Sequence, residues 1–291
     1  MTKQPRPAQY WLSQPNDEVV CRLCPHHCRI RPGKTGICRA RQNLAGRLFA
    51  VNYGQVTSMA LDPIEKKPLA FFRPGSQILS IGSFGCNLRC DFCQNWSISQ
   101  QEAPTRTIMP DEVVAMAEQT VNRGNIGLAY TYNEPLIGFE YVLDCSRLIR
   151  QVGLSNILVT NGFIETGPFA ELLPWIDALN IDLKSWDPSY YRSICGGDLS
   201  TVRSSIKQAA AVAHVEITTL LLPGLNDRDD DIRSLAGWLA SINPKIPLHL
   251  TRYHPDYKRT DPPPISKERL MSLADLARKY LDRVLLGNIL W

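Results

Sequence analysis

The chain has no long hydrophobic run, little excess of charge of either sign and no low-complexity segment. No window approaches the roughly 18 consecutive apolar residues of a membrane-spanning helix. The opening residues MTKQPRPAQYW contain no apolar stretch typical of a signal peptide. Lys and Arg number 32 against 28 Asp and Glu, a net charge of +4 that indicates no dedicated nucleic-acid surface. We therefore expect a cytoplasmic protein that binds neither membranes nor nucleic acids.

Cysteine, by contrast, is plentiful. Nine cysteines occur in 291 residues, an odd number, and seven of them fall into two clusters at positions 21–38 and 86–93. Disulfide scaffolds rarely show such spacing, and thiols in a reducing compartment stay free to bind metals. The two clusters indicate a metal-binding protein.

Alternating strand and helix patterns fill the chain after the first cluster. Runs of apolar and β-branched residues predict strands buried on both faces at 78–84, 126–131, 156–160, 178–184, 215–222 and 248–253, with a seventh at 284–290. Helical patterns lie between them at 111–122, 136–152, 166–175, 201–213, 229–242 and 266–281. Strand and helix that alternate six times predict an α/β fold, an incomplete (β/α)6 TIM-like barrel.

Three regions are expected along the chain. Residues 1–46 show neither period and are rich in Cys, Arg, Pro and Gly, which predicts an N-terminal Cys-rich module. Residues 47–76 hold two short apolar runs around Gly54 and predict a hairpin and connector. The barrel is expected over 77–291. Its functional side chains should lie where the strands end, because these ends share one face.

The segment Cys86-x3-Cys90-x2-Cys93 directly follows the first predicted barrel strand. Thiolate is the usual protein ligand of iron–sulfur clusters, so three thiolates this close can hold three corners of an iron–sulfur cube. They leave the fourth iron open, as catalytic metal sites leave one position open. A zinc site would need a fourth ligand nearby, and buried structural cysteines would not crowd into one loop. The spacing therefore favours a catalytic cluster.

This segment, with Phe92 before the last cysteine, resembles the signature of the radical S-adenosylmethionine (SAM) superfamily. The resemblance implies a [4Fe–4S] cluster on Cys86, Cys90 and Cys93 that a one-electron donor, a flavodoxin or ferredoxin, reduces. It implies an enzyme of oxidoreductase or lyase type, in which SAM is cleaved to a 5′-deoxyadenosyl radical that abstracts hydrogen from a substrate.

Segments at later strand ends extend the resemblance. Tyr132-Asn133-Glu134-Pro135 is similar to the GGEP segment of the superfamily, where Glu134 would accept from the SAM amino group. Other segments are similar to those of glycyl-radical-enzyme activases of the pyruvate formate-lyase type. The cofactor-binding residues so implied are Phe92, Glu134, Asn161, Asp182, Lys184 and His254.

The activase resemblance has further implications and two departures. It places a monovalent cation at Asp182 and gives Lys184 and His254 catalytic roles. Where the activase pattern has an acidic residue, this chain has Val159. Thr218 stands where the SAM-contacting Arg of the pattern would align.

The closer resemblance is to the radical SAM component of the AmmeMemoRadiSam system. It is carried by the N-terminal cysteine segment, by Asp62-Pro63-Ile64-Glu65-Lys66-Lys67-Pro68 and by His254-Pro255-Asp256-Tyr257. It implies Memo-like and AMMECR-like partners and a small-molecule or peptide substrate. The alternatives are a glycyl-radical-enzyme activase and a non-enzymatic iron–sulfur electron carrier or sensor.

The remaining candidates leave alternatives open. Cys21, Cys24, Cys28 and Cys38 supply enough ligands for either a tetrahedral zinc or a fully ligated second cluster. Cys195, beyond the fourth strand, is either a hydrogen-atom donor at the barrel mouth or an ordinary loop cysteine. Aromatic residues near the mouth form either the wall of a pocket or packing between helices and barrel: Tyr132, Trp186, Tyr190 and Tyr191.

Overall fold

The computed structural model describes residues 6–289, and its centre is an eight-stranded sheet. The strands lie in the order β16-β15-β14-β13-β12-β11-β9-β8. All neighbours are parallel except β8 and β9. Their bounds are β8 (Ser58–Pro63), β9 (Gln77–Gly82), β11 (Asn125–Tyr130), β12 (Ser155–Thr160), β13 (Ala178–Asp182), β14 (His214–Leu221), β15 (Leu248–Arg252) and β16 (Val284–Gly287).

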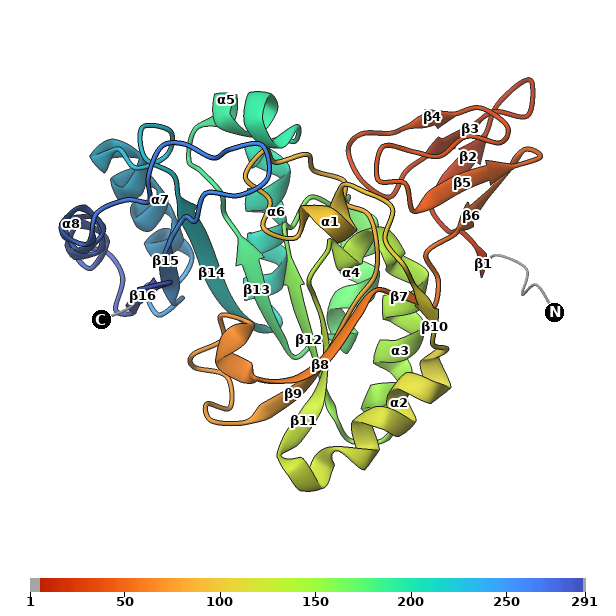
Figure 1. Cartoon of the computed structure of the whole chain (residues 1–291), viewed down its shortest axis with the longest axis horizontal. Coiled ribbons are helices and arrows are strands. Elements are labelled where there is room, and N and C mark those ends of the chain that lie inside the picture. Colours follow the sequence, from red (N-terminus) through yellow and green to blue (C-terminus); the bar gives the residue numbers. More distant parts are fainter. Residues whose placement is uncertain (1–5, 290–291) are drawn as a thin grey trace.

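Helices join successive parallel strands and lie around the outside of the sheet (Figure 1). They are α2 (Pro110–Gln119), α3 (Phe139–Gln151), α4 (Thr166–Leu172), α6 (Leu199–Ala210), α7 (Asp229–Ile242) and α8 (Lys267–Ala277). The sheet has β8 and β16 as edges and does not close, which confirms the predicted incomplete barrel. The predicted end of the last strand at 290 lies outside the described residues.

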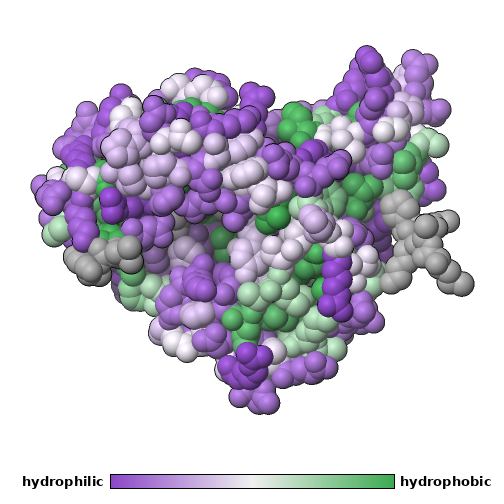
Figure 2. Space-filling view, viewed as in Figure 1, coloured by the Kyte–Doolittle hydropathy of each residue, from purple (hydrophilic) through white to green (hydrophobic). Residues whose placement is uncertain are grey.

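Apolar side chains are mostly used inside the fold. The face in Figure 2 is largely hydrophilic, with hydrophobic side chains in small separate groups. Within residues 6–289 no helix is both long and apolar enough to cross a membrane.

Two small antiparallel sheets form the N-terminal part of the chain, which projects from one side of the barrel (Figure 1). One contains β2 (Trp11–Ser13), β3 (Val19–Cys21) and β4 (Arg29–Ile30), and the other β1 (Arg6–Pro7), β6 (Arg47–Ala50) and β5 (Arg41–Leu44). The β5–β6 pair spans the predicted boundary at residue 46. We call residues 6–50 the N-terminal module.

The predicted hairpin around Gly54 is wrong. Its first apolar run is β6, which pairs with β5, and its second run is β8, which pairs with β9 at the edge of the main sheet. Local apolar runs predicted the strands, but their pairing depends on distant partners. Near Gly54 only the short β7 (Gln55–Val56) forms, and it pairs with β10 (Arg106–Thr107).

A buried ion pair fixes the N-terminal module to α3. Arg41 Nη2 donates to Glu140 Oε1 at 2.8 Å and to Oε2 at 2.9 Å, and both side chains are 1% exposed. The backbone of Gln9 donates to Glu140 and accepts from Arg41. Removal of one partner from such a pair costs about 3–5 kcal/mol, since the other charge stays buried alone. The position of the module against the barrel is therefore strongly constrained.

A second buried carboxylate ties the chain between β8 and β9 to the sheet. Glu216 on β14 is fully buried and accepts from the backbone N–H groups of Ala70 (3.0 Å) and Phe71 (2.8 Å). The Nε2 atoms of His214 (2.9 Å) and His249 (2.6 Å) also lie within hydrogen-bonding distance. Burial opposes ionisation, but these bonds prevail and lower the pKa of Glu216 to about 2.

Replacing Glu216 with Gln should lower the free energy of unfolding at pH 7 by about 1.5–3 kcal/mol, the value of a hydrogen bond to a charged group. The pKa of Glu216 is depressed from 4.5 to about 2 on folding. The stabilisation by the ionised carboxylate is therefore complete above pH 4.5 and is lost as the pH falls toward 2. Urea unfolding of both proteins across this range measures the difference. A gap between them that does not narrow on acidification would contradict the assignment.

Candidate active site

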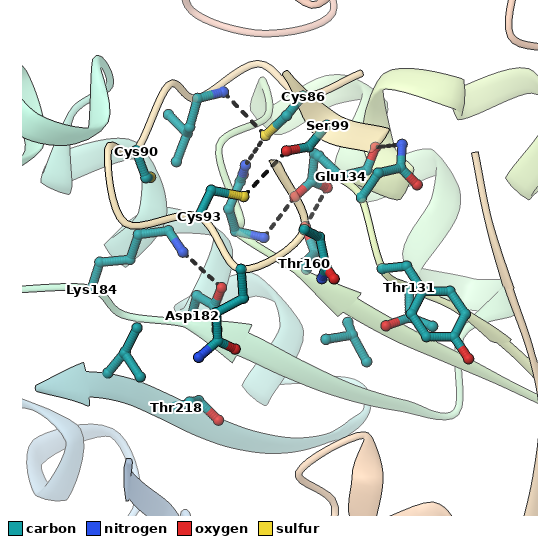
Figure 3. A pocket seen from close by; sticks show the side chains of 18 of the residues that line it. Cys86, Cys90, Cys93, Ser99, Thr131, Glu134, Thr160, Asp182, Lys184 and Thr218 are labelled. Atoms are coloured by element: carbon teal, nitrogen blue, oxygen red, sulfur yellow. Dashed lines mark hydrogen bonds and ion pairs between the residues drawn. The ribbon is translucent and has the colours of Figure 1, made fainter. Parts of the chain in front are cut away.

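The carboxyl ends of the parallel strands surround one pocket, as predicted for a barrel of this type. Figure 3 shows the cysteine loop on one side and strand-end side chains facing it. The lining residues in or beyond the carboxyl-terminal halves of the strands include Thr131, Glu134, Thr160, Asn161, Asp182, Lys184, Thr218 and Thr251. Cys86, Cys90 and Cys93 line the same pocket, with Phe92 between the last two. The fold thus brings together most of the site residues predicted from the sequence.

Each of the three sulfur atoms has a hydrogen-bonding neighbour. These are Leu88 N (3.3 Å) and Asn161 Nδ2 (3.7 Å) at Cys86 Sγ, Ser99 Oγ (3.2 Å) at Cys93 Sγ, and the Cys195 thiol at Cys90. Hydrogen bonds to the sulfurs tune iron–sulfur clusters, so this donor set fits one. Among the described residues no three Cys, His, Asp or Glu side chains stand close enough to share a single metal ion.

Glu134 presents a buried carboxylate to the pocket beyond β11. Its Oε1 accepts from Thr160 Oγ1 (2.6 Å) and Leu136 N (3.0 Å), and its Oε2 accepts from Asn161 N (2.7 Å). Burial outweighs these bonds and raises the pKa of Glu134 to about 7. A carboxylate offers about four acceptor positions, so one remains for a donor in the pocket. An ammonium group is well suited to it.

Lys184 supplies a positive charge at a neighbouring strand end. Its Nζ donates to Asp182 Oδ2 at 2.7 Å. Burial alone would lower the pKa of Lys184, but the Asp182 carboxylate outweighs it and holds the pKa above its ordinary value. The pocket therefore has the Lys184–Asp182 ion pair at one strand end and the Glu134 carboxyl group at another.

Comparison with known proteins identifies this arrangement. Residues 80–236 match the family model described as the Radical SAM superfamily. The chain belongs to the radical SAM superfamily. Members of this superfamily are enzymes, the family implies a [4Fe–4S] cluster and SAM, and its enzymes generally need a one-electron donor. The cluster and SAM fit the thiols and charged groups described above.

Similarity to one relative covers nearly the whole chain, including the N-terminal module. The chain is 40% identical over 290 residues to an uncharacterized protein of Methanocaldococcus jannaschii, covering 98% of this chain and 85% of the other. It is 25% identical to the pyruvate formate-lyase-activating enzyme of Clostridium pasteurianum, over 69% of this chain and 88% of that enzyme.

A solved structure is similar in fold. A radical SAM methyltransferase from Sphaerobacter thermophilus superposes with a TM-score of 0.56 at 17% identity, covering 74% of this chain and 67% of the other. This likeness agrees with the radical SAM barrel.

The radical SAM GGEP-like segment explains the backbone at Tyr132. Tyr132 has a φ of 70°, a left-handed conformation that favours glycine. A Cβ added at Gly82 would lie 2.8 Å from the Cβ of Tyr132. The glycine therefore makes room for the Tyr132 side chain. Tyr132 OH donates to Asp62 Oδ2 at 2.8 Å, and Lys67 Nζ lies 4.7 Å from the ring centre. The Asp62–Lys67 segment noted in the sequence thus holds Tyr132 in this conformation.

Several predicted residues have other positions or partners. His254 is exposed and is not among the lining residues of the pocket. Cys195 is fully buried and is not among the lining residues of the pocket, where a hydrogen-atom donor would need to be. Asn161 does line the pocket, but its Nδ2 donates to Asn87 Oδ1 at 3.0 Å, which makes it a link between β12 and the cysteine loop.

The structure places most of the predicted aromatic residues outside the pocket, and it places Lys184 beside Asp182, the predicted cation ligand. Tyr190 and Tyr191 are buried in packing, and Trp186 packs against Trp238, so only Tyr132 of the four aromatics lines the pocket. At Asp182 the Lys184 ammonium already supplies the positive charge that a monovalent cation would bring.

Thr218, the position where the SAM-contacting Arg of the activase pattern would align, lies in the pocket. Its hydroxyl is buried without a hydrogen-bond partner in the described part of the chain, and it lines the pocket. Thr218 pairs in register with Asp182 on β13, which places it beside the charged groups. In the sequence, Thr218 is a polar residue within the apolar run that forms β14, which also marks it as a candidate for the pocket.

Replacing Glu134 with Gln should weaken SAM binding about 10- to 150-fold, since a hydrogen bond to a charged group contributes about 1.5–3 kcal/mol. The iron content should not change, because Glu134 lies outside the cysteine loop. Anaerobic equilibrium dialysis with labelled SAM measures the affinity. The matched control is Glu118→Gln on the exposed face of α2, which should bind SAM normally. Equal affinities in the two variants would show that Glu134 does not contact SAM.

Proposed function

We propose that this protein is a radical SAM enzyme that abstracts hydrogen from a small molecule or peptide. The observation that carries the proposal is one pocket in which three thiols of a single loop face Glu134 and Lys184 from separate strand ends. When bound there and reduced by a flavodoxin or ferredoxin, a [4Fe–4S] cluster with SAM supplies the 5′-deoxyadenosyl radical. An electron carrier or sensor would not need the charged strand ends.

The charges in the pocket complement the amino-acid end of SAM. Cys86, Cys90 and Cys93 would hold the cluster, Glu134 would accept from the ammonium group, and Lys184 would attract the carboxylate. Asp182 holds Lys184 Nζ in position at 2.7 Å. These roles require no movement of charge in the protein, only orientation by groups that the fold has already fixed.

The loop after β15 packs against the cysteine loop. Arg259 pairs with Asp91, and Lys258 N donates to Asp91 O at 3.1 Å. Tyr257 stacks on Trp96, with ring centres 5.4 Å apart, just beyond the last cysteine. These contacts help to fix the position of the cysteine loop beside the pocket.

The rest of the pocket wall suits a polar substrate. Many of the lining residues carry a hydroxyl or amide group, beside apolar ones such as Leu88 and Phe92, and the Thr218 hydroxyl has no partner among the described residues. Lys66 adds a positive charge at the wall. We favour a small polar molecule or peptide of the AmmeMemo pathway, with Memo-like and AMMECR-like partners; the sequence resemblance supports this choice. The free cysteines support a reducing compartment, so we propose the cytoplasm.

A glycyl-radical-enzyme activase is the second candidate. The 25% identity to the Clostridium pasteurianum activating enzyme favours it. Val159 and Thr218 depart from the activase pattern, and that match covers 69% of this chain. We therefore rank it below a small substrate.

Replacing Cys86, Cys90 and Cys93 together with Ala should remove four irons per chain and abolish SAM cleavage, because these thiols are the proposed ligands. Anaerobic reconstitution, iron analysis and chromatography of 5′-deoxyadenosine measure both effects. Cys145→Ala, at a buried position on α3, is the control and should keep cluster and activity. A triple variant that retains the same iron as the control would refute the assignment.

The ranking of substrates predicts no glycyl radical on a partner. The reduced enzyme and SAM, mixed anaerobically with a glycyl-radical enzyme of the pyruvate formate-lyase type, should give no stoichiometric glycyl signal in electron paramagnetic resonance. A known activating enzyme under the same conditions provides the positive control. A stoichiometric signal from this protein would reverse the ranking and make it an activase.

A further inference from the structure

The four N-terminal cysteines share one cavity. Cys21 lies at the end of β3, Cys24 and Cys28 lie in the turn that leads to β4, and Cys38 precedes β5. All four line a small enclosed cavity of the N-terminal module. Cys21 and Cys38 are buried and the other two half-buried, and none forms a disulfide. The fold therefore brings together cysteines that are up to 17 positions apart in the sequence.

Besides the Arg41–Glu140 pair and buried apolar side chains such as Val19 and Ile30, only short strands hold the module together. Its strands are two to four residues long. Sheets this short bury little apolar surface, and small folds of this kind commonly need a metal or disulfides. Because the four thiols form no disulfides, a bound metal is the other strong cross-link that they could provide.

Arg41 provides an independent sign of a ligand in this cavity. Arg41 lines it together with the four cysteines. Its Nη atoms bond to Glu140 and Gln9, but its Nε is buried without a hydrogen-bond partner. An unpaired buried donor costs about 1–3 kcal/mol. A metal bound by four thiolates remains negatively charged and offers sulfur acceptors, so it would satisfy this N–H group.

The cavity adjoins the back of the active-site cysteine loop. A Cβ added at Gly85, whose φ is 89°, would lie 2.3 Å from the carbonyl oxygen of Cys38. His26 Nε2 lies 2.7 Å from the carbonyl oxygen of Asn87, and Asn87 also lines the cavity. Asn87 in turn accepts from Asn161 at 3.0 Å. The residues on both sides of Cys86 thus pack directly on the N-terminal cysteines.

We infer that Cys21, Cys24, Cys28 and Cys38 form a second metal centre, a four-thiolate site for zinc or an iron–sulfur cluster, which holds the loop around Cys86 from behind. Among the described residues no three Cys, His, Asp or Glu side chains are arranged to hold a metal ion. Either kind of centre would therefore require the four thiols to rearrange around it. The existence of this centre does not depend on the proposed function, but its effect on the Cys86 loop does.

The decisive test uses the variant that lacks Cys86, Cys90 and Cys93, because the N-terminal centre is then its only proposed metal site. The protein is purified anaerobically from cells supplied with zinc and iron, and its zinc, iron and sulfide contents are measured. About one zinc per chain, or iron and sulfide in equal amounts, supports the centre and identifies it. A folded protein with neither overturns it.

A second variant examines the four cysteines in the otherwise unchanged protein. Cys24→Ser with Cys28→Ser should lose the same metal, and its thermal unfolding midpoint should fall by about 5 °C or more. The Cys145→Ser protein, which changes a buried cysteine of α3, should keep all metal. Unchanged metal content in the Cys24/Cys28 variant would overturn the centre. Failure of SAM cleavage in the unmodified protein would instead count against the proposed function alone.

Discussion

The loop from Gly85 to Cys93 must present three thiols to one pocket without regular secondary structure of its own, and the surrounding structure depends on this requirement. Each part of the loop is held by a different region of the chain. Cys38 of the N-terminal module packs on Gly85, Arg89 N donates to Cys195 O at 2.8 Å, and Arg259 pairs with Asp91. Thiolates on a short loop repel one another, so contacts from outside the loop have to supply its rigidity.

The parallel sheet meets a second requirement, the separation of opposite charges. Glu134 and Lys184 lie on different strand ends and have different partners, neutral donors for the first and Asp182 for the second. A direct pair between Glu134 and Lys184 would use the remaining acceptor position of Glu134. Their separation leaves that acceptor position and the remaining N–H donors of Lys184 facing the same pocket. The arrangement of these charged groups around the pocket therefore depends on the order of the strands as well as on the residue types.

Local sequence patterns predicted the features of the structure that are determined by residues close together in the chain. Apolar runs predicted the seven parallel strands closely, and the bounds of α7 agree with the pattern at 229–242. Spacing alone indicated the cluster cysteines. The pairing of β8 with β9 and the outward position of His254 could not be predicted, because both depend on contacts between distant segments. The same holds for Cys195, which is buried at the end of a turn of π-helix at Tyr191–Cys195.

The central claim is that the cysteine loop and the charged strand ends form one site for the reductive cleavage of SAM. The most direct measurement is the yield of 5′-deoxyadenosine and methionine from the anaerobically reconstituted protein, given dithionite and SAM without added substrate. Both products should form in equal amounts, and only when reductant is present. A protein that carries its full complement of iron, binds SAM and yields neither product would contradict this claim.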